Sequence, residues 1–318
     1  MRVFSLLGNT VALDAGTLFA HVPRAMWSRW VDVDDLGRVK LAGRCLLVED
    51  TSRRILVETG PGMCFPEKLR RRYGINPGGD RLLESLDALS LSEEDIHWII
   101  LSHLHFDHAG GLVASHHLGQ PLRLRFPNAR IMISRDAWER SLRPHSRDRA
   151  SFVRNLSPLL RDSGRLRVVA DEHEAEAELG EPFRFRLSEG HTPGMLLPSV
   201  VGSRATLLFA GDLVPATPWL HLPITMGYDR HAELLVDEKA QLYAEMDLDA
   251  TYLFYTHDPR WAASRIAFVD GRYTPTDLVA RIDAWDLNTT VLEQSCRSQL
   301  SHQQEATNVD GNPARDRS

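Results

Sequence analysis

The sequence is poor in cysteine. Its 318 residues include three, at Cys45, Cys64 and Cys296. An odd count in a chain of this length does not suggest a disulfide framework, since a large core needs no covalent staples. We therefore expect free thiols that are buried as small apolar side chains, in a protein from a reducing compartment.

Long apolar runs are also missing. The sequence contains no stretch of about 18 apolar residues, the length that a membrane-spanning helix needs. The apolar run at the N-terminus stops at Gly8-Asn9, too early for the hydrophobic region of a signal peptide. These two features predict a cytoplasmic protein with no membrane partner.

An excess of positive charge is the third feature that the sequence lacks. Lys and Arg total 37 against 43 Asp and Glu, which gives a formal net charge of −6. Proteins that grip nucleic acid through its phosphates usually have a basic balance, so we expect no nucleic-acid partner. The hydrophobic content of 43% is ample for a packed core.

Strand-like and helix-like segments alternate along the chain, which predicts an α/β fold. The expected strands cover residues 3–7, 10–13, 45–48, 55–57, 98–101, 130–134, 166–169, 183–187, 199–201, 206–210 and 251–255. The expected helical segments cover residues 66–73, 81–88, 92–95, 136–142, 233–246 and 276–285. No linker interrupts this alternation, so residues 1–296 are predicted to form one catalytic domain. Residues 297–318 are polar and aperiodic, which predicts a disordered tail.

Three local expectations follow from turn signals. Gly8-Asn9 predicts a hairpin between the first two strands, and the polar turn at residues 49–54 predicts a second hairpin. Residues 20–37, which include Trp27 and Trp30, show few regular signals and are expected to form an ordered loop.

The densest chemical signal is the run Ser-His-Leu-His-Phe-Asp-His-Ala-Gly-Gly, which directly follows a predicted buried strand. His103 and His105 are two residues apart, so an extended chain points both side chains to the same side. The turn at Asp107-His108 can aim two further ligands at the same point. Imidazole and carboxylate groups together suit zinc, iron and similar ions. The run therefore predicts a metal site.

This run resembles the His-x-His-x-Asp-His signature of the metallo-β-lactamase superfamily. Later segments also resemble landmarks of that superfamily, in the same order: Gly-His-Thr-Pro-Gly at residues 190–194, Ala-Gly-Asp at 210–212 and Thr-His-Asp-Pro at 256–259. The segment Leu-Val-Glu-Thr-Gly at 56–60 is similar to an early strand and turn, with Glu58 where the family usually has Asp. The resemblance covers about residues 1–285 and implies a four-layer αββα sandwich.

The resemblance also implies a complete set of ligands for two divalent metal ions. The first ion would be held by His103, His105 and His191, and the second by Asp107, His108 and His257, with Asp212 bridging the two. The resemblance points to zinc first, with iron, manganese and cobalt as alternatives. A metal-bridging hydroxide would attack the substrate, and Asp107 would also accept and return a proton.

The segment at residues 211–229 narrows the resemblance to one branch. It is similar to the YtnP-like quorum-quenching lactonases and, more loosely, to the methyl parathion hydrolases. That branch implies hydrolysis of a lactone such as an acyl-homoserine lactone. Some lactonases have a substrate-binding Tyr three residues after the bridging Asp, where this chain has Pro215. Tyr228 is a candidate substitute that would donate to a developing oxyanion, and it is equally well explained by packing. His221 fits a structural or pocket-wall role better than that of a ligand.

Other activities remain open at this point. They include aryl ester or phosphotriester hydrolysis and a thioesterase similar to glyoxalase II. A persulfide dioxygenase shares much of the metal motif. A non-enzymatic scaffold is also conceivable, but the full ligand set argues against it. The expected partner is a small ester or lactone. The segment at residues 20–30 is a candidate dimer arm, because lactonases that the chain resembles are often dimers.

Overall fold

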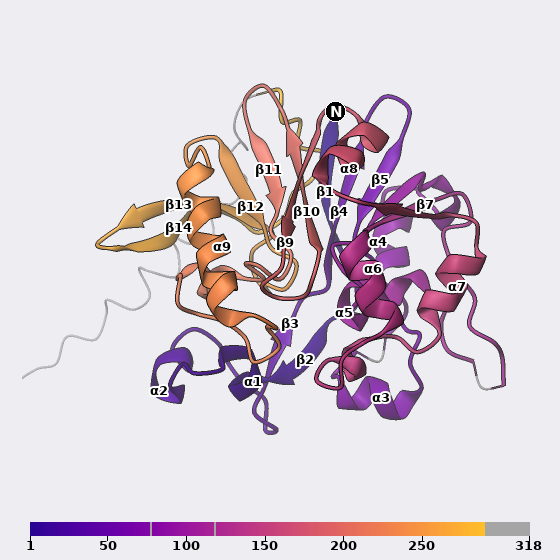
Figure 1. The fold of residues 1–318 in the computed structure, drawn as a ribbon, viewed down its shortest axis with the longest axis horizontal. Coiled ribbons are helices and arrows are strands. Elements are labelled where there is room, and N and C mark those ends of the chain that lie inside the picture. Colours follow the sequence, from indigo (N-terminus) through magenta and orange to yellow (C-terminus); the bar gives the residue numbers. More distant parts are fainter. Residues whose placement is uncertain (77, 118, 290–318) are drawn as a thin grey trace, which may run out of the picture.

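The structure is a computed structural model that describes residues 1–76, 78–117 and 119–289. Two six-stranded sheets face each other in its centre (Figure 1). The first sheet has the order β1-β4-β5-β6-β7-β8 and the second has the order β14-β13-β12-β11-β10-β9. A separate ribbon pairs β2 with β3. The predicted tail at 297–318 and Cys296 lie outside the described residues.

The strands have the following bounds. The first sheet contains β1 Arg2–Leu7, β4 Arg44–Glu49, β5 Arg54–Val57, β6 Trp98–Ile100, β7 Arg130–Ser134 and β8 Leu166–Val169. The second contains β9 Phe183–Ser188, β10 Met195–Val201, β11 Thr206–Phe209, β12 Thr251–Phe254, β13 Ala263–Val269 and β14 Arg272–Val279. The small ribbon contains β2 Val11–Asp14 and β3 Arg38–Leu41.

The helices are mostly short. The α-helices are α1 Ala15–Phe19, α2 Arg24–Trp27, α3 Glu67–Arg72, α4 Arg81–Asp87, α5 Phe106–Ala109, α6 Arg135–Leu142, α7 Leu156–Asp162, α8 Glu172–Leu179 and α9 Ala232–Glu245. Four 3₁₀ turns complete the described elements, η1 Glu93–Asp95, η2 Gly110–Leu112, η3 Arg149–Ser151 and η4 Thr217–Leu220. None of the helices in the described ranges is long and apolar enough to cross a membrane.

Three hydrophobic clusters define the layers. Alternate residues of β4 face opposite ways: Leu46 and Val48 enter the cluster between the two sheets, whereas Cys45 and Leu47 enter the cluster under the outer helices. This is why β4 is an unbroken apolar run, since both of its faces are buried. A third cluster joins β10–β12 to α9, which covers the second sheet (Figure 1). The predicted α/β class and the four-layer αββα arrangement are confirmed.

Two predictions were wrong, the hairpin at Gly8-Asn9 and the helix at residues 276–285, because pairing with distant strands determines the structure of both segments. β1 does not form a hairpin with β2. It pairs antiparallel with β4, and Gly8 donates its N–H to the Gly43 carbonyl at 2.8 Å. The predicted helix at residues 276–285 is instead β14 followed by an irregular segment. β14 pairs with β13, and Trp285 exchanges backbone hydrogen bonds with Val3.

The other local expectations fare better. β4 and β5 form the predicted antiparallel hairpin. Residues 20–37 are mainly a loop, as expected, but contain the one-turn helix α2. This segment is held by an aromatic stack in which Phe19 lies 5.6 Å from Trp27 and 4.7 Å from Trp219 between ring centroids. Cys45 and Cys64 are free and buried, as predicted.

Candidate metal centre

The metal motif follows the buried strand β6. His105 has extended backbone angles and caps the N-terminus of the one-turn helix α5, which carries Asp107 and His108. Gly110 and Gly111 lie directly against the backbone of Pro61 and Thr59, where a Cβ atom would clash with the carbonyl oxygens. The glycines let this turn pack tightly, and it therefore returns the α5 side chains toward His103 and His105.

Three histidines form the first group of ligand atoms. His103 and His105 lie before α5, and His191 lies in the loop between β9 and β10. His103 Nε2 is 3.0 Å from His105 Nδ1, and His191 Nε2 is 3.2 Å from the same atom. All three side chains are buried. Their ring nitrogens thus converge on one point and could together hold a metal ion.

A second group joins Asp107, His108 and His257. His257 follows β12 in the second sheet, and its Nε2 lies 3.2 Å from His108 Nε2 and 3.6 Å from Asp107 Oδ2. His108 and His257 are buried, whereas Asp107 is partly exposed. Asp107 is therefore the most exposed member of this group.

Asp212 lies between the two groups. Its Oδ2 is 3.2 Å from His191 Nε2 and 3.3 Å from His108 Nε2, and its Oδ1 is 3.3 Å from His257 Nε2. One carboxylate thus contacts ligand atoms of both groups. The structure brings all seven predicted ligands together.

The donor set fits metal ions. Ligands that lie about 2.0–2.2 Å from one tetrahedral ion are about 3.3–3.6 Å apart, close to the observed separations. The buried Asp212 Oδ1 has no hydrogen-bond donor within the described part of the chain. Buried carboxylate oxygens are normally paired, so an oxygen in this state suits a cation.

Protein oxygens orient the outer nitrogens of these rings. His191 Nδ1 lies 2.8 Å from Asp229 Oδ1, and His257 Nδ1 donates to the Ala42 carbonyl at 2.7 Å. Such contacts fix the tautomer and aim the opposite nitrogen at the ligand cluster.

Glu58 supports His108 where the family usually has Asp. Its Oε1 accepts the Ser102 N–H at 2.7 Å, and its Oε2 lies 3.4 Å from His108 Nδ1. Glu58 itself is held at a φ of 67°, an uncommon angle for a residue other than glycine. The longer side chain thus still reaches the metal motif.

Charges within the cluster control protonation. Burial, together with the neighbouring histidines, holds the pKa of His103 and His105 well below the usual value, so both rings are neutral. Burial also disfavours charge on His108, but Asp212, Glu58 and Asp107 raise its pKa well above the usual value. The cluster of histidines lowers the pKa of Asp212 against the effect of burial. His103 and His105 are therefore in the neutral form that binds a metal, whereas His108 would release a proton on binding one.

The two further candidates lie in different places. Tyr228 directly precedes Asp229 and packs against the main cluster. Burial, followed by the charge of Asp107, raises the pKa of its phenol to about 12, so the hydroxyl keeps its proton. His221 is exposed, and burial together with the charges of Lys239 and Arg272 lowers its pKa. It belongs to neither group of ligand atoms.

Two supporting residues were not predicted from the sequence. Asp229 joins His191 to the Met226 N–H, which it accepts at 2.6 Å. Lys239 on α9 is fully buried and donates to the carbonyls of Trp219, His221 and Ile224. The sequence offered one indication that Asp229 belongs to the site, namely its position beside Tyr228 at the end of the segment at residues 211–229. The sequence offered no such indication for Lys239, because a lysine in an amphipathic helix is normally a surface residue.

The fold and this site together define a two-sheet protein with a cluster of metal ligands at the ends of its strands. The model of the metallo-β-lactamase superfamily matches residues 38–257, and the chain belongs to that superfamily. An N-acyl homoserine lactonase from Bacillus sp. is 27% identical over 163 residues, 47% of this chain and 54% of the relative. N-acyl homoserine lactonase AiiA from Bacillus thuringiensis subsp. kurstaki is 26% identical over the same length. The chain thus matches about half the length of these curated relatives.

Solved structures share the fold over a longer stretch. A probable metal-dependent hydrolase from Staphylococcus aureus has a TM-score of 0.76 and 20% identity, with 89% of this chain and 98% of that chain covered. AidC, a dizinc quorum-quenching lactonase in complex with a product, has a TM-score of 0.69 and 20% identity, with 89% and 95% covered. The family model confirms the predicted superfamily, and N-acyl homoserine lactonases are among its distant relatives.

Proposed function

We propose that the protein is a metal-dependent hydrolase that holds two divalent ions, with zinc as the first choice. The observation that carries the proposal is the position of Asp212 between two groups of converging ligand atoms. His103, His105 and His191 would hold one ion, and Asp107, His108 and His257 the other. When bound, such a pair of ions supplies Lewis acidity and a water acidified enough to act as a hydroxide nucleophile.

The chain's own groups would then position the substrate and move protons. Asp107 is more exposed than the histidines beside it, and its carboxylate can accept a proton and return it to the leaving group. The Tyr228 hydroxyl stays protonated at neutral pH, so it can donate a hydrogen bond to an oxygen that gains negative charge. The buried histidines and Asp229 keep the cluster rigid during these steps.

The substrate that we propose is a lactone of the acyl-homoserine-lactone type. The homologous stretch in the named lactonases and the product-bound lactonase with the same fold support this class. The protein would then act in quorum quenching, and we place this activity in the cytoplasm. The exposed Met26 and Trp30 suit the dimer arm proposed at residues 20–30.

A hydrolysis panel with zinc-loaded protein tests this function. It contains short-chain and long-chain acyl-homoserine lactones, an aryl ester, a phosphotriester, a β-lactam and a thioester. We expect the highest kcat/KM on one of the lactones. Asp212→Ala should lose most of its bound metal and at least about a hundredfold in kcat/KM, since it removes the shared ligand.

Tyr228→Phe separates the proposed donor from a packing role. A lost oxyanion donor lowers kcat by about tenfold or more with metal content and melting temperature unchanged. A packing role would instead lower the melting temperature and leave kcat close to that of the wild type. A thioester hydrolysed faster than any lactone would overturn the proposed substrate, and a protein that binds no metal would overturn the hydrolase itself.

A further inference from the structure

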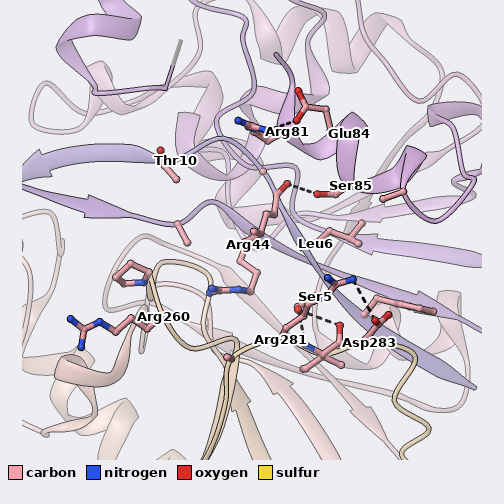
Figure 2. Close-up of a pocket in the computed structure, with 18 of the residues that line it drawn as sticks. Ser5, Leu6, Thr10, Arg44, Arg81, Glu84, Ser85, Arg260, Arg281 and Asp283 are labelled. Carbon is pink, nitrogen blue, oxygen red and sulfur yellow. Dashed lines mark hydrogen bonds and ion pairs between the residues drawn. The ribbon is translucent and has the colours of Figure 1, made fainter. Parts of the chain in front are cut away.

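A cavity lies at the edge of the sandwich, away from the seven candidate metal ligands. Its volume is about 670 Å³, and it is bordered by the end of β1, the helix α4 and the segments at residues 259–260 and 280–283 (Figure 2). None of the seven metal ligands lines it. The cavity is therefore separate from the site described above.

The walls of this cavity are apolar and its rim is basic. Phe4, Leu6 and Ile282 are buried lining residues, and Leu7 exposes 54% of its surface. The rim carries four positively charged side chains and two carboxylates. The positive side chains are Lys40, Arg81, Arg260 and Arg281, and the carboxylates are Glu84 and Asp283. A local excess of positive charge in a chain with a net charge of −6 favours an anionic ligand.

Arg44 is the buried member of this basic group. It lines the cavity although only 3% of its surface is exposed, and Figure 2 shows its side chain reaching toward the middle of the lining residues. Its Nη1 donates to the carbonyls of Tyr255 and Asp258 at 2.8 and 2.9 Å. Among the described residues, no carboxylate forms an ion pair with it.

The unused edge of Arg44 has the shape of a carboxylate receptor. Its Nε and Nη2 make no hydrogen bond within the described part of the chain, and these two N–H groups form the side-on fork of a guanidinium. This fork binds both oxygens of a carboxylate through parallel hydrogen bonds. A buried guanidinium without an acidic partner is costly, and an anion in the cavity would offset that cost.

We propose that this cavity binds an organic carboxylate with an apolar chain. The carboxylate pairs with the free edge of Arg44, and the chain lies against Phe4, Leu6 and Leu7. The basic rim attracts the anion and the apolar walls select its tail. The size of the cavity falls within the range of small-molecule sites, which are likewise mainly apolar with few polar anchors. This inference does not depend on the proposed hydrolytic activity.

Calorimetric titration of the metal-loaded protein with octanoate tests the inference. Because Arg44 also holds the loop around His257, Arg44 is left intact and the cavity is blocked instead with Ala88→Trp, at another lining residue. Ala88 is exposed at the end of α4, so the indole fills the cavity without disturbing the core. We expect at least tenfold weaker octanoate binding. Asp87→Trp, on the same helix but outside the cavity, is the matched control and should bind within twofold of the wild type.

The rim and the ligand charge are tested in parallel. Arg281→Glu should weaken octanoate binding at least threefold, whereas Arg143→Glu, which also removes an exposed arginine paired with a carboxylate, should not. Neutral octanamide should bind at least tenfold more weakly than octanoate. If octanoate still binds to Ala88→Trp as tightly as to the wild type, the proposed location of the site is wrong. If octanamide binds as tightly as octanoate, the site does not require a carboxylate. If inorganic phosphate binds as tightly as octanoate, the site does not require an apolar chain. If Ala88→Trp loses octanoate binding but hydrolyses lactones at the wild-type rate, the cavity and the proposed hydrolytic site are independent of each other.

Discussion

At the scale of single residues, His191 and His257 are each held at two points. One ring nitrogen faces the cluster and the other faces a protein oxygen, from Asp229 for His191 and from the Ala42 carbonyl for His257. The ring can therefore neither rotate nor change tautomer without losing a buried hydrogen bond. Asp229 is the informative case, because it adds to the effect of Asp212 in raising the pKa of the His191 ring against the effect of burial.

Replacement of Asp229 tests this support. Asp229→Ala removes the acceptor from His191 Nδ1, so we expect metal affinity to fall by about 10–100-fold. Asp229→Asn should have a smaller effect, because its amide oxygen can still accept one hydrogen bond. Competitive titration with a zinc-sensitive dye measures the affinity. Asp237→Ala, which removes an exposed carboxylate from α9, should keep wild-type affinity. Equal affinities for Asp229→Ala and this control would show that His191 needs no partner.

The seven candidate ligands stand out in the sequence because each lies in a short motif whose turn chemistry is local, and the structure places them together. Asp229 could not, because its role depends on the loop after η4 folding back over His191. Glu58 shows an intermediate case. Its place in the strand and turn was evident, but its contacts needed the distances to Ser102 and His108.

At the scale of elements, α9 anchors the loop that carries Tyr228 and Asp229. Lys239 inserts its ammonium group into this loop and donates to three carbonyls, the shortest contact being 2.7 Å to Ile224. Tyr243, one turn further along the helix, donates to the Leu220 carbonyl. The loop is thus fixed by side chains of a helix in a different layer from the metal motif.

Lys239→Met should destabilise the protein in a pH-dependent way. Burial lowers the pKa of Lys239 from 10.5 to about 7, so the unfolded chain binds a proton between these values that the native chain has released. Wild-type stability therefore rises with pH across this window, by up to about 1.4 kcal/mol per unit, and the variant lacks that gain. At pH 9 we expect a loss of about 2–4 kcal/mol, because buried carbonyls lose their donor. Urea unfolding at pH 7 and pH 9 measures both effects.

Lys68→Met is the control for this experiment, since Lys68 is exposed on α3. Its stability should match the wild type at both pH values. If Lys239 stayed charged when folded, the stability deficit of Lys239→Met would be the same at pH 7 and pH 9.

Strands that bury both faces were predictable from their apolar runs, whereas the exposed edge strand β14 was not. β4, β5 and β6 show continuous apolar runs because they lie inside the first sheet. β14 lies at the edge of the second sheet, contains Pro275 and has no buried residue. Its apolar spacing therefore carries no strand signal, and residues 276–285 were mistaken for a helix. Only the pairing with β13 decides its structure.

At the scale of the whole molecule, the ligand cluster connects the two sheets. His103, His105, Asp107 and His108 follow β6 of the first sheet. His191, Asp212 and His257 come from loops of the second sheet, after β9, β11 and β12. Ions held by both sets would link the two halves of the sandwich, and their binding energy would add to the stability of the fold.

Removal of the ions should therefore lower the melting temperature of the whole domain. An ion present at about a hundred times its dissociation constant contributes about 2.7 kcal/mol, so we expect chelation to lower the melting temperature by roughly 5–10 °C. Added zinc should restore it. Differential scanning calorimetry measures the shift, and Asp212→Ala, which lacks the shared ligand, should respond much less to the chelator.

If only one half of the molecule binds the ions, near-UV circular dichroism and calorimetry will show two separate transitions after chelation. A single transition at a lower temperature is the outcome that we expect, because the core between the sheets is continuous from Val3 to Leu287.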